Sequence, residues 1–336
     1  MPVKAIIDLN NIIYNAKAVK SRLPSGVKFC AVVKADGYGH GAERVANALY
    51  NIADCFAVAT VSEGVKLRLS GIDKEILVLM GVETCELSQA LDYSLTLTAG
   101  SLCDLKRYER AGKTRGARVK THIKCDTGMR RQGISDVSEL KAALNFCEKS
   151  KFLFLCGLYS HFARPENDRS REKAVKKFRS FVNLVKGKNI TCHISASGGF
   201  IKGEYFDMVR VGILLYGYKP FKTDIIKVKP AMKIVAPVVK RERLSRGECA
   251  LYGDKRAEKD TDLTLIRYGY ADGLNRKETA GQFNNRCMDI TALTGKSGGR
   301  TVVVMDNADK TAEKYGTISY EILVKCALRA EKIYKF

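Results

Sequence analysis

The first 225 residues alternate between short apolar runs and longer stretches whose apolar residues recur at helical spacing. Eight of the short runs have the length and the β-branched content of buried strands. These runs are KFCAVVKA, CFAVAT, EILVLMG, SLTLTA, RVKTHIKCD, LFLCGLYSHF, ITCHISAS and MVRVGILLYG. Eight strand–helix alternations in roughly 225 residues predict an α/β fold, a parallel (β/α)8 barrel of the TIM type, rather than a doubly wound sheet.

Helix boundaries are marked in several of the connecting stretches. SEGVKLRLSG and SLCDLKRYERAG each offer a serine as the N-cap and a glycine just past the predicted helix, and SDVSELKAALNFCEKS predicts a longer helix. From about residue 226 the pattern changes to strands without a convincing amphipathic helix: KPAMKIVAPVVKRERL, DLTLIRYGY, RTVVVM and EILVKCAL. The chain therefore divides into a barrel, residues 1–225, and a smaller β-rich domain, residues 226–336. The opening run VKAIIDL predicts an extra strand that fits either domain.

Composition narrows the class of protein. With 46% apolar residues and only 6 prolines in 336, the chain is globular, and no apolar stretch reaches the roughly 20 residues of a membrane span. We expect a cytoplasmic protein without a membrane partner. The 11 cysteines form no C-x-x-C pair and are interpreted as reduced, mostly core residues, and the 4 histidines have no ligand spacing, so no metal site is predicted.

The formal charge of +22 comes from lysines and arginines scattered along the chain. Because no aromatic residues interleave with basic clusters and no zinc-finger spacing occurs, the charge predicts a solvated basic surface rather than a nucleic-acid partner. Such a surface would attract small anions, for example phosphate esters and carboxylates, toward a cleft.

The stretch AVVKADGYGHGA places a lysine and three glycines between a predicted strand and a predicted helix. Backbone N–H groups at such a junction commonly hold anionic cofactors. One interpretation makes Lys34 an ordinary strand-end lysine beside a glycine turn. Another makes Gly37, Gly39 and Ala42 the dinucleotide fingerprint of a nicotinamide-dependent oxidoreductase, with Asp54 or Glu63 for the ribose.

Chemistry in a (β/α)8 barrel lies at the carboxyl ends of the strands. The residues expected there offer nucleophiles, bases and groups that bind anions. They are Lys34 and Tyr38 from the first strand, Lys124, Asp126 and Arg131 from the fifth, His161 from the sixth, Ser197 from the seventh, and Arg210, Gly212 and Ile213 from the eighth.

These segments resemble the alanine racemase family, the barrel-type enzymes that use pyridoxal 5′-phosphate (PLP). AVVKADGYGHG resembles the PLP-lysine motif, DTGMRRQG the family's DTGM-x-R-x-G, and SHFA and MVRVGILLYG the middle barrel motifs. GYADG, RCMD and SYE resemble motifs of the family's second domain. The seven motifs run in the family's order over nearly the whole chain.

The resemblance implies PLP bound as a Schiff base to Lys34. It places the cofactor phosphate against the following groups: Tyr38, Ser197, Tyr320 and the backbone N–H groups of Gly212 and Ile213. An amine nucleophile needs partial desolvation to lower its pKa, which the end of an apolar strand supplies.

The resemblance also implies a two-base racemase that forms D-alanine, usually for peptidoglycan. Lys34 serves one face of the substrate, and Tyr270, from the second domain of a partner subunit in a homodimer, serves the other. In the family's arrangement His161, linked onward to Arg210, adjusts the Tyr270 phenol, and Arg210 also faces the pyridine nitrogen. Three further residues complete the implied site: Arg131 and the main chain of Met288 for the substrate carboxylate, and Lys124, which is carbamylated in some members.

Two alternatives on the same scaffold stay open from the sequence. Side-chain discrimination by one hydroxyl is weak, so a serine racemase fits nearly as well as an alanine racemase. A PLP-binding carrier or regulator without turnover is the other alternative, and Tyr270 argues against it because a carrier needs no second base.

Overall fold

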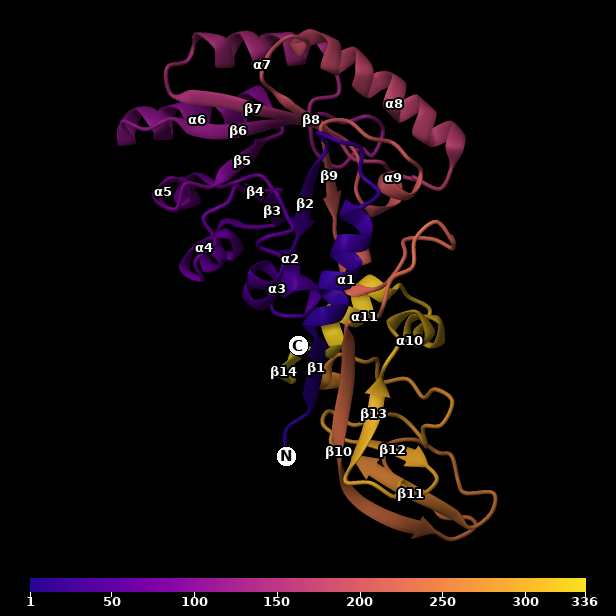
Figure 1. Cartoon of the computed structure of the whole chain (residues 1–336). Coiled ribbons are helices and arrows are strands. Elements are labelled where there is room, and N and C mark those ends of the chain that lie inside the picture. The colour runs from indigo at the N-terminus through magenta and orange to yellow at the C-terminus, as the bar shows by residue number, and fades with distance from the viewer.

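The computed structural model describes residues 1–336 and has a barrel at one end and an elongated second domain at the other (Figure 1). Eight parallel strands pair in the order β8-β7-β6-β5-β4-β3-β2-β9. Their bounds are β2 (Lys28–Val32), β3 (Cys55–Val58), β4 (Ile76–Val78), β5 (Thr96–Ala99), β6 (Val119–Lys124), β7 (Leu153–Tyr159), β8 (Thr191–His193) and β9 (Met208–Val211). A parallel bridge between Ala196 and Arg210 joins the two ends of the row. The predicted barrel is confirmed.

Helices cover the outside of the strands, as expected for a parallel sheet that is buried on both faces (Figure 1). They are α1 (Leu9–Lys20), α3 (Ala42–Ala48), α4 (Val61–Leu69), α5 (Leu87–Asp92), α6 (Leu102–Arg115), α7 (Val137–Lys149), α8 (Asp168–Val182) and α9 (Ser197–Ile201). Every residue of β3, β4, β5 and β9 is buried, which explains why these strands appear in the sequence as unbroken apolar runs.

Two of the predicted helix boundaries need correction. The N-cap of α4 is Thr60 and not the serine of SEGVKLRLSG, because Thr60 and Glu63 form a capping box: Glu63 N–H donates to the Thr60 hydroxyl, and the Glu63 carboxylate accepts from Thr60 N–H. Ser101 does cap α6, but this helix continues through Gly112 and ends at Gly116, which has a left-handed φ of 61°.

The second domain is organised by the long strand β10 (Met232–Leu244), which pairs antiparallel with β1, β11 and β13. The other strands are β1 (Lys4–Asp8), β11 (Thr261–Ile266), β12 (Thr291–Thr294), β13 (Thr301–Met305) and β14 (Glu331–Lys335). Strand β1 also pairs in parallel with β14. The opening run VKAIIDL therefore joins the second sheet, and the two ends of the chain lie side by side.

The prediction of no amphipathic helix in the second domain is wrong. This domain contains α10 (Ala308–Tyr315) and α11 (Ser319–Cys326), and EILVKCAL belongs to α11 rather than to a strand. Ser319, Ile322, Leu323 and Cys326 are its buried residues, which is the spacing of one helical face. That face packs toward the barrel, since a Cβ on Gly39 would lie 2.5 Å from the Leu323 carbonyl oxygen.

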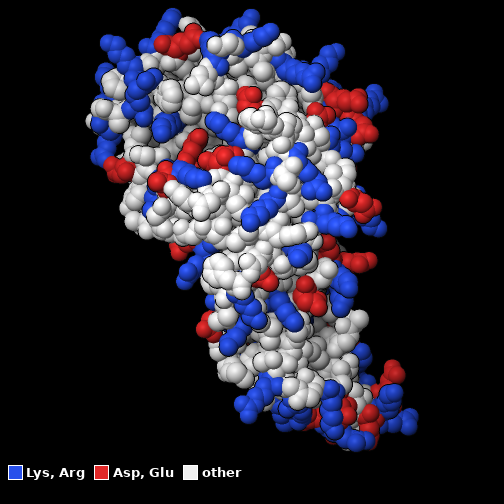
Figure 2. All heavy atoms as spheres, in the orientation of Figure 1, with Lys and Arg blue, Asp and Glu red and all other residues white.

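Lysines and arginines are spread over both domains with acidic residues among them, not gathered into one stripe (Figure 2). None of the helices is both long and apolar enough to cross a membrane.

Candidate active site

Lys34 opens a left-handed turn, α2 (Lys34–Tyr38), directly after strand β2. Ala35, Asp36, Gly37 and Tyr38 all have positive φ values between 52° and 61°. For residues other than glycine this conformation costs roughly 1–2 kcal/mol each. Such a turn persists only where its surroundings over-determine it, and strain of this kind is typical of functional sites.

Several bonds hold the turn in place. Ala35 N–H donates to the Glu63 carboxylate at 2.7 Å, and Ala42 N–H donates to the Asp36 carboxylate at 2.9 Å. Lys332 from β14 pairs with Asp36 at 2.8 Å. The second domain therefore helps to position the lysine-bearing turn of the barrel.

The dinucleotide interpretation fails on this geometry. Gly37 belongs to a left-handed turn, not to the N-terminus of a helix. Both candidate ribose acids already have structural partners: Asp54 accepts from Lys20 and from Phe29 N–H, and Glu63 accepts from Ala35 and Ala59 N–H. No free carboxylate is left for a ribose.

The residues expected to hold a phosphate converge next to this turn. Tyr38 and Tyr320 have ring centroids 6.0 Å apart, although Tyr320 comes from α11. Gly212 N–H donates to the Ser197 hydroxyl at 3.3 Å, and a Cβ on Gly212 would lie 2.6 Å from the Tyr38 hydroxyl. Ile213 begins the short helix η3 (Ile213–Tyr216) directly after Gly212. Three hydroxyls and the backbone of two consecutive residues thus lie close together in a cluster to which both domains contribute, and we call this cluster the anion cradle.

Arg210 lies at the centre of a buried polar network. Its Nη2 donates to the Ser160 carbonyl at 2.7 Å and lies 3.3 Å from His161 Nδ1, while its Nη1 donates to His193 Nδ1. Its Nε–H makes no hydrogen bond within the chain. Loss of water contact and the neighbouring arginine lower the pKa of His161 well below its usual value, so this imidazole is neutral.

The two lysines at this mouth of the barrel have lowered pKa values. Burial and then Arg131 lower the pKa of Lys34, with Glu63 acting in the opposite direction. Burial, Arg131, Arg210 and Lys34 lower the pKa of Lys124 to about 8. A lowered pKa raises the fraction of the neutral amine, which is the nucleophilic and basic form.

The loop after β6 places Arg131 over this mouth. Asp126 accepts hydrogen bonds from Gly128 N–H at 2.6 Å and from Arg131 N–H at 3.2 Å. Lys124, at the end of β6, donates to Gln132 at 3.4 Å. The Asp126 carboxylate thus helps to order the DTGMRRQG loop.

Tyr270 and Met288 lie together on the second domain. Ala271 N–H donates to the Met288 carbonyl at 3.0 Å, and Tyr270 N–H donates to the Cys287 carbonyl at 3.0 Å. Their side chains are 38% and 54% exposed, high values for large apolar residues. No hydrogen bond joins Tyr270 to Lys34, His161 or Arg210 within one chain.

Family comparison agrees with this arrangement over both domains. The model for the alanine racemase N-terminal domain matches residues 7–220, and the model for the alanine racemase C-terminal domain matches residues 231–334. The chain belongs to the alanine racemase family.

Curated relatives and solved structures carry the same family name. "Alanine racemase 2" of Caldanaerobacter subterraneus subsp. tengcongensis is 32% identical over 371 aligned residues, which cover 99% of this chain and 95% of the relative. An alanine racemase of Treponema denticola is 36% identical over 291 aligned residues, which cover 81% of this chain and 76% of the relative. The structure of alanine racemase from Clostridium difficile 630 superimposes with a TM-score of 0.94 at 27% identity, covering 100% of this chain and 96% of that one. Nothing in these matches supports the serine racemase alternative.

Some polar residues of this alanine racemase scaffold were not expected from the sequence. His193 stacks on Tyr159 with ring centroids 4.9 Å apart, and His122 Nδ1 lies 3.1 Å from His193 Nε2. A signal was present, since Lys120, His122 and Lys124 alternate along β6 and so share the face that points into the barrel.

Proposed function

We propose that this chain interconverts L- and D-alanine with PLP held on Lys34. The observation that carries the proposal is the convergence of a lysine of lowered pKa, an anion cradle and a buried arginine at one mouth of the barrel. Membership of the alanine racemase family over both domains supports the same reaction.

The residues at this mouth fit PLP. Tyr38, Ser197, Tyr320 and the backbone of Gly212 and Ile213 offer the hydroxyls and N–H groups that a phosphate accepts from. The free Nε–H of Arg210 is a donor suited to a pyridine nitrogen, and a guanidinium does not give its proton away. When bound, PLP supplies an electron sink that stabilises negative charge at the substrate Cα.

Racemisation needs a proton-transfer group on each face of the substrate. Lys34 Nζ, whose pKa is lowered by burial and by Arg131, takes or returns the Cα proton on one face. The Tyr270 hydroxyl does so on the other face. A phenol has an ordinary pKa of about 10, so the neutral His161, held by Arg210, would adjust this base.

Arg131 is proposed to bind the substrate carboxylate together with the main chain of Met288. With its pKa lowered to about 8, Lys124 has a neutral fraction that can add carbon dioxide, which forms an N–C bond and releases one proton. The resulting carbamate would turn a cation beside Arg131 into an anion, and this would fix the arginine for the carboxylate.

The purified protein supplied with PLP is expected to convert L-alanine into the racemic mixture, with decay of the circular dichroism of the substrate as the measurement. L-Serine serves as the comparator, because one hydroxyl changes the rate only modestly in a permissive pocket. Faster conversion of serine than of alanine would favour the serine racemase. If the protein binds PLP but converts neither amino acid, the remaining alternative is a PLP-binding carrier or regulator without turnover.

The exposed pair Tyr270 and Met288 supports a homodimer with shared sites. A two-fold axis that places this pair of one subunit over the Lys34 mouth of the other makes two such sites at once. Burying both side chains on a second copy would also remove two large exposed apolar groups from water.

Subunit mixing is expected to restore activity between two inactive variants, Lys34→Ala and Tyr270→Phe. In a heterodimer, one site carries both defects and the other is intact. Random exchange makes half of the dimers heterodimers, so about a quarter of the wild-type rate should return. Heterodimers that form but stay inactive would place both residues in the same subunit's site.

A further inference from the structure

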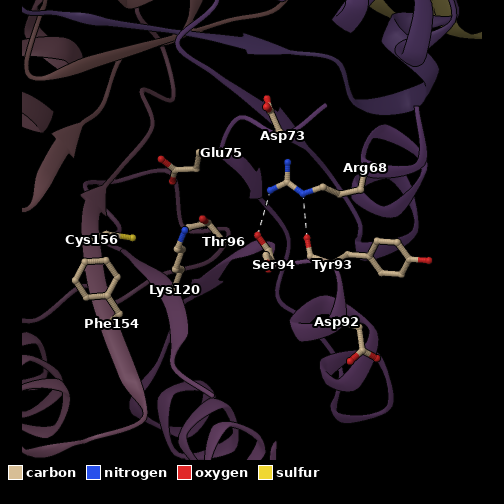
Figure 3. A pocket seen from close by; sticks show the side chains of 10 residues that line it. All are labelled: Arg68, Asp73, Glu75, Asp92, Tyr93, Ser94, Thr96, Lys120, Phe154 and Cys156. Carbon is tan, nitrogen blue, oxygen red and sulfur yellow. Dashed lines mark hydrogen bonds between the residues drawn. The ribbon is translucent and has the colours of Figure 1, made fainter. Parts of the chain in front are cut away.

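The opposite mouth of the barrel, at the amino ends of the strands, holds a cavity of about 500 Å³ (Figure 3). Glu75 precedes β4, and Cys156 lies on β7 with its sulfur turned toward the cavity. Directly behind them is His122 of β6, which is buried inside the barrel. The racemisation scheme uses none of these three side chains.

A carboxylate oxygen of Glu75, a ring nitrogen of His122 and the Cys156 sulfur all lie within 4.8 Å of one another. His122 Nε2 is 3.4 Å from Glu75 Oε1. We propose that these side chains form a site for a divalent cation of the zinc class, entered from the cavity, with water as the remaining ligand. Because the three residues come from separate segments, the loop before β4 and the strands β6 and β7, no spacing rule in the sequence reveals them, and the prediction of no metal site rested on spacing alone.

The ligand chemistry selects the cation. A thiolate, an imidazole and a carboxylate together suit Zn²⁺, whereas Mg²⁺ and Ca²⁺ prefer oxygen ligands. Metal–ligand bonds of about 2.0–2.3 Å require ligand atoms roughly 3.3–3.8 Å apart, so the His122–Glu75 pair already fits. Cys156, whose S–H donates weakly to the Thr121 carbonyl at 3.6 Å, needs a small rotation and releases one proton as the metal–sulfur bond forms.

The surroundings of the three ligands fit this role. A Cβ on Gly157 would overlap the His122 ring, so a glycine at this place on β7 lets the imidazole lie flat against the strand. The second nitrogen of His122 faces His193, as the outer nitrogen of a ligating histidine usually faces a polar partner. Of the two basic residues at the cavity, Arg68 already donates to four backbone carbonyls, while Lys120 carries a free charge that a bound cation must tolerate.

A hydrogen-bond chain connects this site to Arg210. A guanidinium only donates, so His193 Nδ1 accepts from Arg210. The proton of neutral His193 is then on Nε2 and is donated to His122 Nδ1, which leaves the Nε2–H of His122 to donate to Glu75. Arg210 thus determines the tautomer of His193, and His193 determines the tautomer of His122.

A cation bound to His122 Nε2 reverses the direction of the hydrogen bonds in this chain. The displaced proton moves to His122 Nδ1, His193 Nε2 must then accept, and the His193 proton faces the Arg210 donor. The Arg210–His193 bond breaks, which loosens the guanidinium assigned to the cofactor. Bound Zn²⁺ is therefore expected to inhibit racemisation. This coupling rests on the proposed function, whereas binding at the site does not.

The test is titration of the full-length protein with Zn²⁺ by calorimetry, comparing wild type, Cys156→Ser and the control Cys103→Ser, which alters an exposed cysteine of α6. Wild type and the control should bind one Zn²⁺ per chain at the site, and Cys156→Ser should bind it at least about tenfold more weakly. Cd²⁺ should give a thiolate charge-transfer absorption that Cys156→Ser lacks. Equal Zn²⁺ affinity and equal Cd²⁺ absorption in both variants would overturn the site.

Glu75→Gln provides a second variant, because it keeps an oxygen to accept from His122 but removes the ligand charge. It too should bind Zn²⁺ more weakly, and unchanged affinity would contradict the proposal even if Cys156→Ser failed to fold. Zn²⁺ should slow racemisation by the wild type but not by Cys156→Ser. Binding without slowing would overturn the coupling to Arg210, and a protein without racemase activity would still report the site through calorimetry and Cd²⁺ absorption.

Discussion

Lys34→Ala is expected to lower the rate of alanine racemisation by about 10⁴-fold or more, the largest effect of any single substitution in the chain. Loss of one general base costs about 10²–10⁴-fold, and this change also removes the amine that attaches PLP. Burial and Arg131 lower the pKa of Lys34, which raises the fraction of the neutral amine that both roles need. The rate is measured by circular dichroism with excess PLP.

Borohydride reduction followed by peptide mapping tests the assignment in the wild type. The pyridoxyl group should be on Lys34, although Lys124 at the same mouth also has a lowered pKa and is the natural competitor. Lys66→Ala, a change to an exposed lysine of α4, is the matched control and should leave the rate unchanged. A pyridoxyl group on Lys124 instead of Lys34 would contradict the assignment of Lys34 as the PLP-binding lysine.

Tyr270→Phe is expected to lower the rate by about 10²–10⁴-fold in at least one direction while PLP binding is retained. The substitution keeps the ring and removes only the hydroxyl that carries the proton. Since each direction of the reaction begins with proton removal on a different face, isotope wash-in at Cα should become unequal for L- and D-alanine.

Tyr252→Phe is the matched control for Tyr270→Phe, because Tyr252 is another exposed tyrosine of the second domain. This control should retain the wild-type rate and symmetric isotope exchange. Wild-type activity in Tyr270→Phe would leave the two-base scheme without its second member.

The barrel could be predicted because its strands carry their own signal. Parallel strands covered on both faces are continuous apolar runs, and each is followed by a stretch of helical period. The α4 capping box is also visible in the sequence, because Thr60 and Glu63 are three residues apart, the spacing of an N-cap and its N3 partner.

For helix α11 the local sequence pattern predicts the wrong kind of element. Its run of Ile, Leu and Val has the composition of a strand, and only the burial of Ile322, Leu323 and Cys326 on one side identifies a helix. That burial depends on the barrel surface around Gly39, which is distant in the sequence. The domain to which strand β1 belongs is likewise not visible in its local sequence, because its partners β10 and β14 come from the other end of the chain.

The sequence by itself determined the succession of strands and helices in the barrel, since that depends on local period. The two-domain division and the residues proposed for the anion cradle stay predictions, which rest on a change of pattern and on motifs in a familiar order. The tertiary structure alone decided the left-handed turn that presents Lys34, the row from Arg210 through His193 and His122 to Glu75, and the exposure of Tyr270. The physical reason is common to all three. Backbone strain, tautomers and exposure are set by groups far apart in the chain, and only packing brings those groups together.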